Sequence, residues 1–272
     1  MPLLALTERQ ARELAYHQDR ALRLAQLIDE PVSLDVVTSS NRHWWNPYWC
    51  VYSLLRNASI AGKKALVLGC GFGEDAIRLS SLGMDVCACD LCSDSVAIAT
   101  ARARKTVRSE CIHFQVMPAE KLTYGDDAFD LILAVDIFHH VDIPATLLEL
   151  HRVAKPNCVL LCLEMYTHSW LTSIRESRLV SRFLYPAMVQ WIYGSNRPYI
   201  TADERKLNEK EITLITDSLS SARTDWFYAI INRLVPDRFT ALEICDRIAI
   251  KLLGPFGSIV AGRVILRGQI PK

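Results

Sequence analysis

Three glycines at alternate positions are the residues of this sequence best placed to bind a ligand. Gly69, Gly71 and Gly73 follow the apolar run 65–68, and apolar residues take up helical spacing from Ala76 onward. Glycine lets the backbone adopt a positive φ and leaves room where a Cβ would collide with a ligand. The helix that follows directs the free amides of its first turn toward the same point. The pattern therefore predicts a strand, a tight cofactor-binding turn and a helix.

An acidic residue further along the chain indicates that the ligand contains a ribose. Asp90 ends a second apolar run, 84–89, about 20 positions after Gly69. Its carboxylate can accept hydrogen bonds from both vicinal hydroxyls of a ribose. A dinucleotide fingerprint would place its third glycine three residues after Gly71, where this chain has Glu74. Because that carboxylate would repel a pyrophosphate, the spacing favours a nucleoside cofactor without phosphate.

The elements that must position these residues alternate between apolar runs and helical segments. A helix is predicted over 144–153, between the fourth and fifth strands. The further predicted strands cover residues 84–89, 112–117, 129–135, 157–164, 226–231 and 258–267. This alternation predicts an α/β fold with a doubly wound, seven-stranded, mostly parallel sheet.

The ordered motifs of residues 60–165 resemble those of class I S-adenosylmethionine-dependent methyltransferases. The resemblance implies a Rossmann-like methyltransferase fold, an antiparallel last strand near the sheet edge, and S-adenosyl-L-methionine as the cofactor. Two positions depart from the common pattern: Val67 and Pro118 stand where many relatives carry acidic residues. The cofactor-binding residues that it implies are Gly69, Cys70, Gly71, Gly73, Asp90, Leu91, Ala119, Glu120, Val135 and Asp136.

Two histidines follow the fourth predicted strand and are the catalytic candidates. His139 and His140 stand at its carboxyl end, where open α/β sheets bind their ligands. Histidine can accept a proton from a methyl acceptor near neutral pH, although in this family one such ring commonly has a structural role. No metal is expected, because the cluster of Cys87, Cys89 and Cys92 has no second ligand pair at a suitable spacing.

Four regions are predicted along the chain. Residues 1–58 form an N-terminal helical lid, 59–164 the S-adenosylmethionine-binding core, 165–207 a helical cap insertion, and 208–272 the rest of the core sheet with a second helical insertion. Candidate residues for binding the acceptor are Trp45, Tyr48, Tyr166, Arg175 and Tyr193.

Two features of the predicted lid and cap allow more than one interpretation. The aromatic stretch 41–49 could cover the cofactor or could clamp the N-terminal helix onto the sheet. Arg175, Arg178 and Arg182 are spaced for one helical face. That face could bind an anionic acceptor, or it could be an ordinary solvated face.

The amino-acid composition limits which partners and which cell compartment are expected. The 272 residues include 50% apolar and 22% charged residues with a net charge of +1, which disfavours nucleic acid as a partner. Nine scattered cysteines are typical of a reducing compartment. The sequence begins without a basic leader and contains no apolar run of about 20 residues, so we expect a cytoplasmic protein without stable membrane insertion.

The sequence as a whole predicts a methyltransferase that acts by in-line displacement. The methyl group would pass to an O, N or C atom of a small or medium organic acceptor, such as a lipid-like or natural-product molecule. Two alternatives remain open: a nicotinamide-dependent oxidoreductase, and a non-catalytic cofactor-binding protein of the same fold. Aromatic residues of the cap insertion could also serve a homodimer interface.

Overall fold

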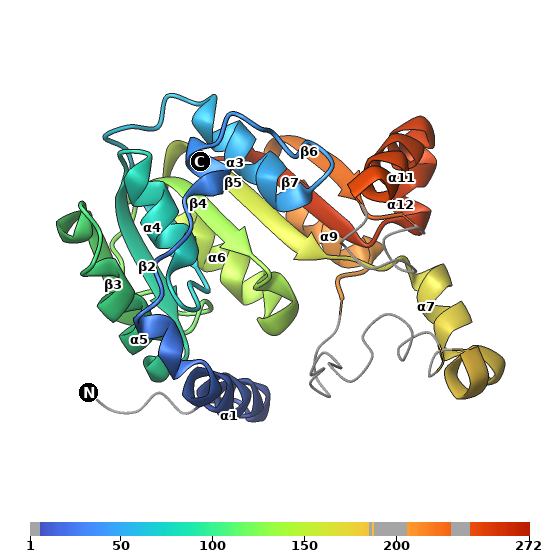
Figure 1. Ribbon diagram of the computed structural model, residues 1–272, viewed down its shortest axis with the longest axis horizontal. Helices are drawn as coiled ribbons and strands as arrows, with labels where there is room; N and C mark the ends of the chain where they lie inside the picture. Colours follow the sequence, from blue (N-terminus) through green and yellow to red (C-terminus); the bar gives the residue numbers. More distant parts are fainter. Residues whose placement is uncertain (1–5, 185–186, 188–205, 230–239) are drawn as a thin grey trace.

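A seven-stranded sheet forms the centre of the computed structural model, which describes residues 6–184, 187, 206–229 and 240–272 (Figure 1). The strand order is β3-β2-β1-β4-β5-β7-β6, and β7 runs antiparallel to both of its neighbours while the other pairs are parallel. This arrangement confirms the predicted doubly wound, mostly parallel sheet. The strands are β1 Lys64–Leu68, β2 Asp85–Asp90, β3 Ile112–Val116, β4 Phe129–Val135, β5 Ala154–Met165, β6 Ser220–Phe227 and β7 Arg263–Gln269.

Helices cover both faces of the sheet. Buried side chains of α6 and α9 belong to the apolar core on one face, and those of α3 and α4 to the core on the other. The central strands therefore carry apolar residues on both faces, as parallel strands between helical layers require. The helices are α1 Glu8–Arg23, α2 Asp35–Thr38, α3 Pro47–Arg56, α4 Glu74–Ser81, α5 Ser93–Ala103, α6 Ile143–Val153, α7 Ser169–Glu176, α9 Glu209–Asp217, α11 Thr240–Leu252 and α12 Gly257–Val260.

The last two strands are displaced from their predicted positions. Strand β6 begins at Ser220 rather than near Trp226, and its first half is exposed because only β7 pairs with it. An edge strand of this kind needs few apolar residues, so its polar half gave no strand signal. Strand β7 begins at Arg263, since residues 257–260 form the short helix α12.

The N-terminal region forms a helix and an aromatic segment that lie in different places. Helix α1 starts with a capping box between Thr7 and Gln10 and lies against α5. The aromatic stretch leads into α3, whose Tyr52 is fully buried on the sheet. The indole Nε1 of Trp45 donates a hydrogen bond to Glu243 of α11 at 2.9 Å. This segment therefore packs onto the sheet and onto α11.

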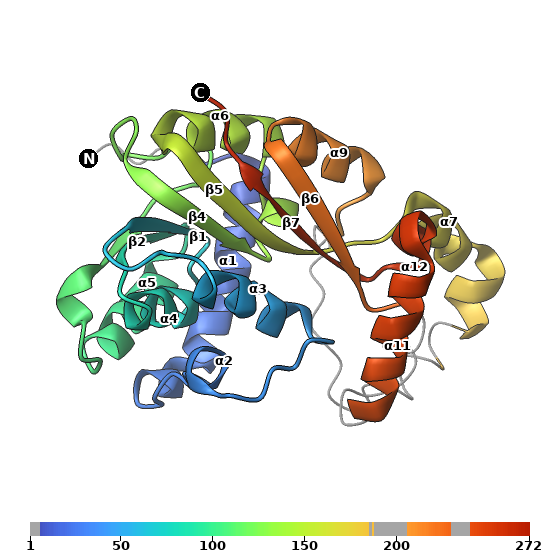
Figure 2. The same cartoon turned by 90° about the horizontal axis from the view of Figure 1, so that it is seen from above.

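The two insertions gather at one end of the molecule, where α7, α11 and α12 lie together in both views (Figures 1 and 2). Helix α7 ends at Glu176, and Ser177 turns to an extended conformation with ψ 145° before a π-helix at Val180–Leu184. The prediction of a single arginine face was therefore wrong, because Arg178 and Arg182 lie beyond the end of the helix that contains Arg175.

Candidate functional site

The carboxyl ends of β1, β2, β3 and β4 meet at one cavity, which encloses about 870 Å³ counting the part open to solvent. Helix α1 forms its opposite wall. A cavity at this edge is where open α/β sheets bind ligands. It is lined by Gln10, Glu13, His17, Arg20, Gly69, Gly71, Cys89, Asp90, Leu91, Met117, Pro118, Ala119, Glu120, Val135, Asp136, Ile137, His140 and Val141.

The three glycines of the turn have different structural tasks. All have positive φ, but a Cβ on Gly69 would lie 2.7 Å from the Ile137 side chain, and one on Gly73 would lie 2.9 Å from Cβ of Ala99. Gly71 has φ +49°, and an added Cβ would have no described atom within 4 Å. Because Gly71 also lines the cavity, its missing side chain leaves room for a ligand to approach the backbone.

Asp90 is held in place by the backbone around the cavity. One carboxylate oxygen accepts a hydrogen bond from the amide of Gly71 at 2.8 Å, and the other accepts one from the amide of Cys92 at 2.9 Å. A carboxylate oxygen has a second lone pair, so both oxygens can still accept from the hydroxyls of a ribose.

The segment after β3 supplies an apolar surface and a carboxylate. Met117, Pro118 and Ala119 line the cavity, and Glu120 follows them. The carboxylate of Glu120 accepts hydrogen bonds from the side chain of Gln10 at 3.2 Å and from the amide of Asp142 at 3.1 Å. Glu120 thus connects the wall formed by α1 to the sheet edge.

The turn after β4 depends on a buried carboxylate of β5. Glu164 is fully buried and accepts hydrogen bonds from the amides of Ile137 at 2.7 Å and Phe138 at 2.6 Å. Its other oxygen lies 2.7 Å from Nδ1 of His139, which is also buried. Only His140 of the histidine pair lines the cavity. The carboxylate of Asp136 forms an ion pair with Arg263 at 2.6 Å.

Helix α1 brings a polar group to the cavity that sequence reasoning missed. Glu13 is only 4% exposed, and its Oε2 lies 2.9 Å from Nδ1 of His140. Burial raises the pKa of Glu13, but the neighbouring His140, His17 and Arg9 together lower it by more, so the net shift is downward. Burial lowers the pKa of His17, which favours the neutral imidazole. A signal was present, because Gln10, Glu13, His17 and Arg20 share helical spacing.

The other predicted site residues lie away from the cavity. Cys70 is buried, and burial raises the pKa of its thiol well above the ordinary value. Tyr48 donates a hydrogen bond to Asp75, and Tyr166 is fully buried with its ring packed on Trp226 at 4.8 Å. Among the described residues, none after Val141 lines the cavity. The side chain of Arg175 and the whole of Tyr193 lie outside the described residues.

The cavity fits S-adenosylmethionine better than a dinucleotide. The carboxylates of Asp90 and Glu120 line a space that would hold a positively charged cofactor, and Arg20 provides a positive charge for the carboxylate of the methionine part. At the start of α4, where a pyrophosphate would bind, Glu74 pairs with Arg102 and so occupies the anion-favouring end of the helix.

Comparison with known proteins agrees with this geometry. Residues 66–162 match a family model described as "Methyltransferase domain". The chain carries a class I methyltransferase domain. The match begins within β1 and ends within β5, so it includes the carboxyl ends of β1, β2, β3 and β4, which meet at the cavity.

Relatives of the methyltransferase domain include enzymes named as methyltransferases of quinone biosynthesis. The chain is 28% identical over 130 residues to the ubiquinone biosynthesis O-methyltransferase of Psychrobacter cryohalolentis, covering 46% of this chain and 50% of the relative. It is 30% identical over 140 residues to the ubiquinone/menaquinone biosynthesis C-methyltransferase of Rubrivivax gelatinosus, covering 51% and 53%. The chain thus spans about half the length of the curated relatives it matches.

A solved structure shares the fold over nearly the whole chain. Geranyl diphosphate C-methyltransferase from Streptomyces coelicolor covers 98% of this chain and 100% of its own, with a TM-score of 0.63 and 12% identity. This similarity extends beyond the methyltransferase domain to the C-terminal strands, and it concerns the fold alone.

Proposed function

We propose that the chain binds S-adenosylmethionine in this cavity and transfers its methyl group to an O, N or C atom of a small or medium organic acceptor. The observation that carries the proposal is the convergence of Gly71, Asp90 and residues 117–120 on one cavity inside a methyltransferase domain. The named relatives, which include O- and C-methyltransferases of quinone biosynthesis, support an acceptor of this size.

Each part of the cofactor has a matching part of the cavity. The carboxylate of Asp90 would accept hydrogen bonds from the ribose, and the adenine would lie along Met117 and Ala119 beside Glu120. The methionine part would pass Gly71, where no side chain obstructs it. Arg20 of α1 would then pair with its carboxylate, so the helix both covers the cofactor and binds it.

The residues of the chain contribute mainly alignment and exclusion of water. The bound cofactor supplies a methyl carbon attached to a sulfonium, which is open to attack by a lone pair in line with the departing sulfur. Holding both partners in that line provides a large part of the rate enhancement. Glu164 fixes the turn that carries His140, which places the ring at the cavity, whereas His139 is engaged with Glu164. We therefore propose His140 rather than His139 as the group beside the acceptor.

A substitution that keeps the shape of Asp90 but removes its charge tests the proposal. In thermal melts we expect S-adenosylmethionine and its demethylated product to stabilise the wild-type protein, and Asp90→Asn to lose most of that shift. Asp85→Asn removes an exposed carboxylate at the start of the same strand and serves as the matched control. An equal ligand-induced shift in both variants would count against the cofactor site.

The site of action forms a further part of the proposal. All nine cysteines are free thiols, which supports a reducing compartment such as the cytoplasm. Within the ranges that the structure describes, no helix is long and apolar enough to cross a membrane. The small net charge supports a small-molecule acceptor rather than nucleic acid.

A further inference from the structure

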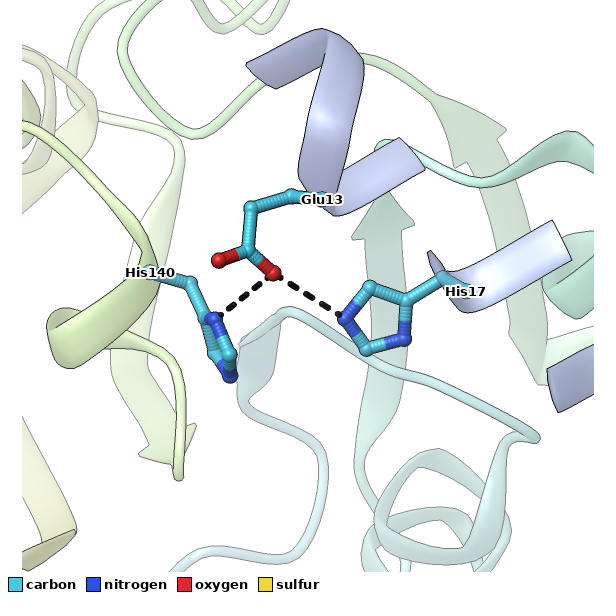
Figure 3. A group of neighbouring side chains, drawn as sticks. All are labelled: Glu13, His17 and His140. Carbon is cyan, nitrogen blue, oxygen red and sulfur yellow. Dashed lines mark ion pairs between the residues drawn. The ribbon is translucent and has the colours of Figure 1, made fainter. Parts of the chain in front are cut away.

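Glu13, His17 and His140 bring a carboxylate and two imidazoles together at the wall of the cavity (Figure 3). Glu13 and His17 stand one turn apart on α1, and His140 comes from the turn after β4. Both rings turn a nitrogen toward Oε2 of Glu13, with Nδ1 of His140 at 2.9 Å and Nε2 of His17 at 3.9 Å. One ligand atom from each residue lies within 4.8 Å of the others.

These separations suit three ligands of one ion. Nitrogen and oxygen atoms bound to a metal at about 2.0–2.2 Å lie about 2.9–3.5 Å from one another. The distance of 2.9 Å from Glu13 to His140 lies within that interval, and the distance of 3.9 Å to His17 exceeds it, so a small movement of the His17 ring would bring the atoms around a common centre. Two imidazoles and one carboxylate favour a transition metal such as Zn²⁺, Mn²⁺ or Fe²⁺ over Mg²⁺ or Ca²⁺, which prefer oxygen ligands.

The buried carboxylate itself points to a ligand. Glu13 is more than nine-tenths buried, yet neither of its oxygens accepts a hydrogen bond of good geometry from any residue that the structure describes. A buried polar atom without a hydrogen-bond partner requires an explanation, and a bound ion is one of the few explanations for it. The charge of the carboxylate would also offset part of the charge of the cation.

A second group of ligand-type residues nearby shows the contrast. Asp136, His139 and Glu164 also lie close together. However, Glu164 already accepts from two backbone amides, while Asp136 pairs with Arg263. Those carboxylates have partners outside their own group, whereas the ion pairs of Glu13 are with His17 and His140, the two imidazoles of its group.

We propose that Glu13, His17 and His140 form a binding site for a divalent transition metal beside the methyl donor. Three protein ligands leave open coordination positions, and all three of these residues line the cavity. The open positions would bind an acceptor through a hydroxyl oxygen, which makes hydroxyl-bearing molecules the preferred acceptor class. This role in selecting the acceptor rests on the proposed function, but binding of the metal does not.

Coordination of the acceptor to the metal would also explain how its hydroxyl loses a proton. A hydroxyl bound to a divalent metal loses its proton more readily than a free one, so the proton can pass to water without a histidine base. The oxygen then forms a bond to the methyl carbon as the bond between that carbon and sulfur breaks. The products are the methyl ether and the demethylated, uncharged thioether.

The test uses untagged, chelator-treated full-length protein titrated with Co²⁺ and with Zn²⁺. We expect saturable binding of one ion per chain by calorimetry, together with Co²⁺ absorption bands typical of nitrogen and oxygen ligands. Glu13→Gln and His17→Ala should each weaken binding at least tenfold. His113→Ala, which changes an exposed histidine of β3, should leave binding unchanged.

Three results would overturn the site. One is wild-type protein that melts cooperatively but binds neither ion. Another is a Co²⁺ spectrum of the wild-type protein that lacks the bands of nitrogen ligands. This measurement does not depend on whether the variants fold. The third is an affinity equal to wild type in folded Glu13→Gln and His17→Ala. Titration of the same samples with S-adenosylmethionine separates the two proposals, because loss of metal binding alone leaves the methyl-donor site intact.

Discussion

Adding a single methyl group at Gly71 would separate the cost of backbone strain from the cost of blocking the ligand. Gly71 has φ +49°, and an alanine there would carry the penalty of the left-handed region, about 1–2 kcal/mol. Alanine also lowers the conformational entropy of the unfolded chain, which stabilises the folded state by about 0.4–1 kcal/mol and offsets part of that penalty. We therefore expect Gly71→Ala to lower the free energy of unfolding by about 1 kcal/mol.

A matched glycine gives the control. Gly62 has φ +75°, and a Cβ there would likewise have no described atom within 4 Å, but this residue does not line the cavity. Gly62→Ala should therefore lose a similar amount of stability in urea unfolding. Only Gly71→Ala should also weaken S-adenosylmethionine binding by calorimetry, by at least tenfold, or about 1.4 kcal/mol. Equal affinities in the two variants would refute the reasoning that the cofactor passes over Gly71.

Three further changes test the supports of the site. Glu164→Gln should destabilise the fold by about 1.5–3 kcal/mol in urea, since it removes a buried charge that accepts from two amides and pairs with His139, and an unchanged midpoint would contradict that role. Burial raises the pKa of Glu209, but hydrogen bonds from Ser169 and from its own backbone amide, with the charge of His168, outweigh burial and lower the pKa from 4.5 to about 2. The stabilising effect of Glu209 is therefore complete above pH 4.5 and is lost as the pH falls toward 2. Glu209→Gln should thus lower the free energy of unfolding by about 1 kcal/mol at pH 7 and reduce its pH dependence between pH 2 and 4.5. The control Lys210→Gln, which changes the exposed neighbouring residue, should do neither. Trp45→Phe removes the hydrogen bond to Glu243 and should cost about 1 kcal/mol without changing cofactor affinity, whereas a tenfold loss of affinity would restore the lid interpretation of the aromatic stretch.

The sheet could be predicted from the sequence because its core strands are marked at their carboxyl ends. The runs that end at Leu68, Cys89 and Val135 are apolar, short and followed by a glycine or an acidic residue, and each lies in a strand of the parallel core. Strand β6 could not be placed in this way. Its polar residues 220–225 lie at the sheet edge, where one neighbour suffices and no apolar alternation is needed.

The cavity floor could be predicted, but its wall could not. Gly71, Asp90 and Glu120 line the cavity as the motif order suggests, because the carboxyl ends of parallel strands meet at one edge. The spacing of Glu13 and His17 shows that they share a helical face, but it cannot show which surface that face covers. Conversely, Tyr48 and Trp45 resembled ligand-binding aromatics, yet they contact Asp75 and Glu243 through packing that only tertiary structure reveals.

Calorimetric titration of the wild-type protein with S-adenosylmethionine, and in parallel with NADH, tests the central claim most directly. The account predicts saturable binding of one S-adenosylmethionine per chain and no binding of NADH, since Glu74 and Arg102 occupy the place of a pyrophosphate. Saturable binding of NADH, or of neither compound, would contradict the assignment of this cavity to a methyl donor.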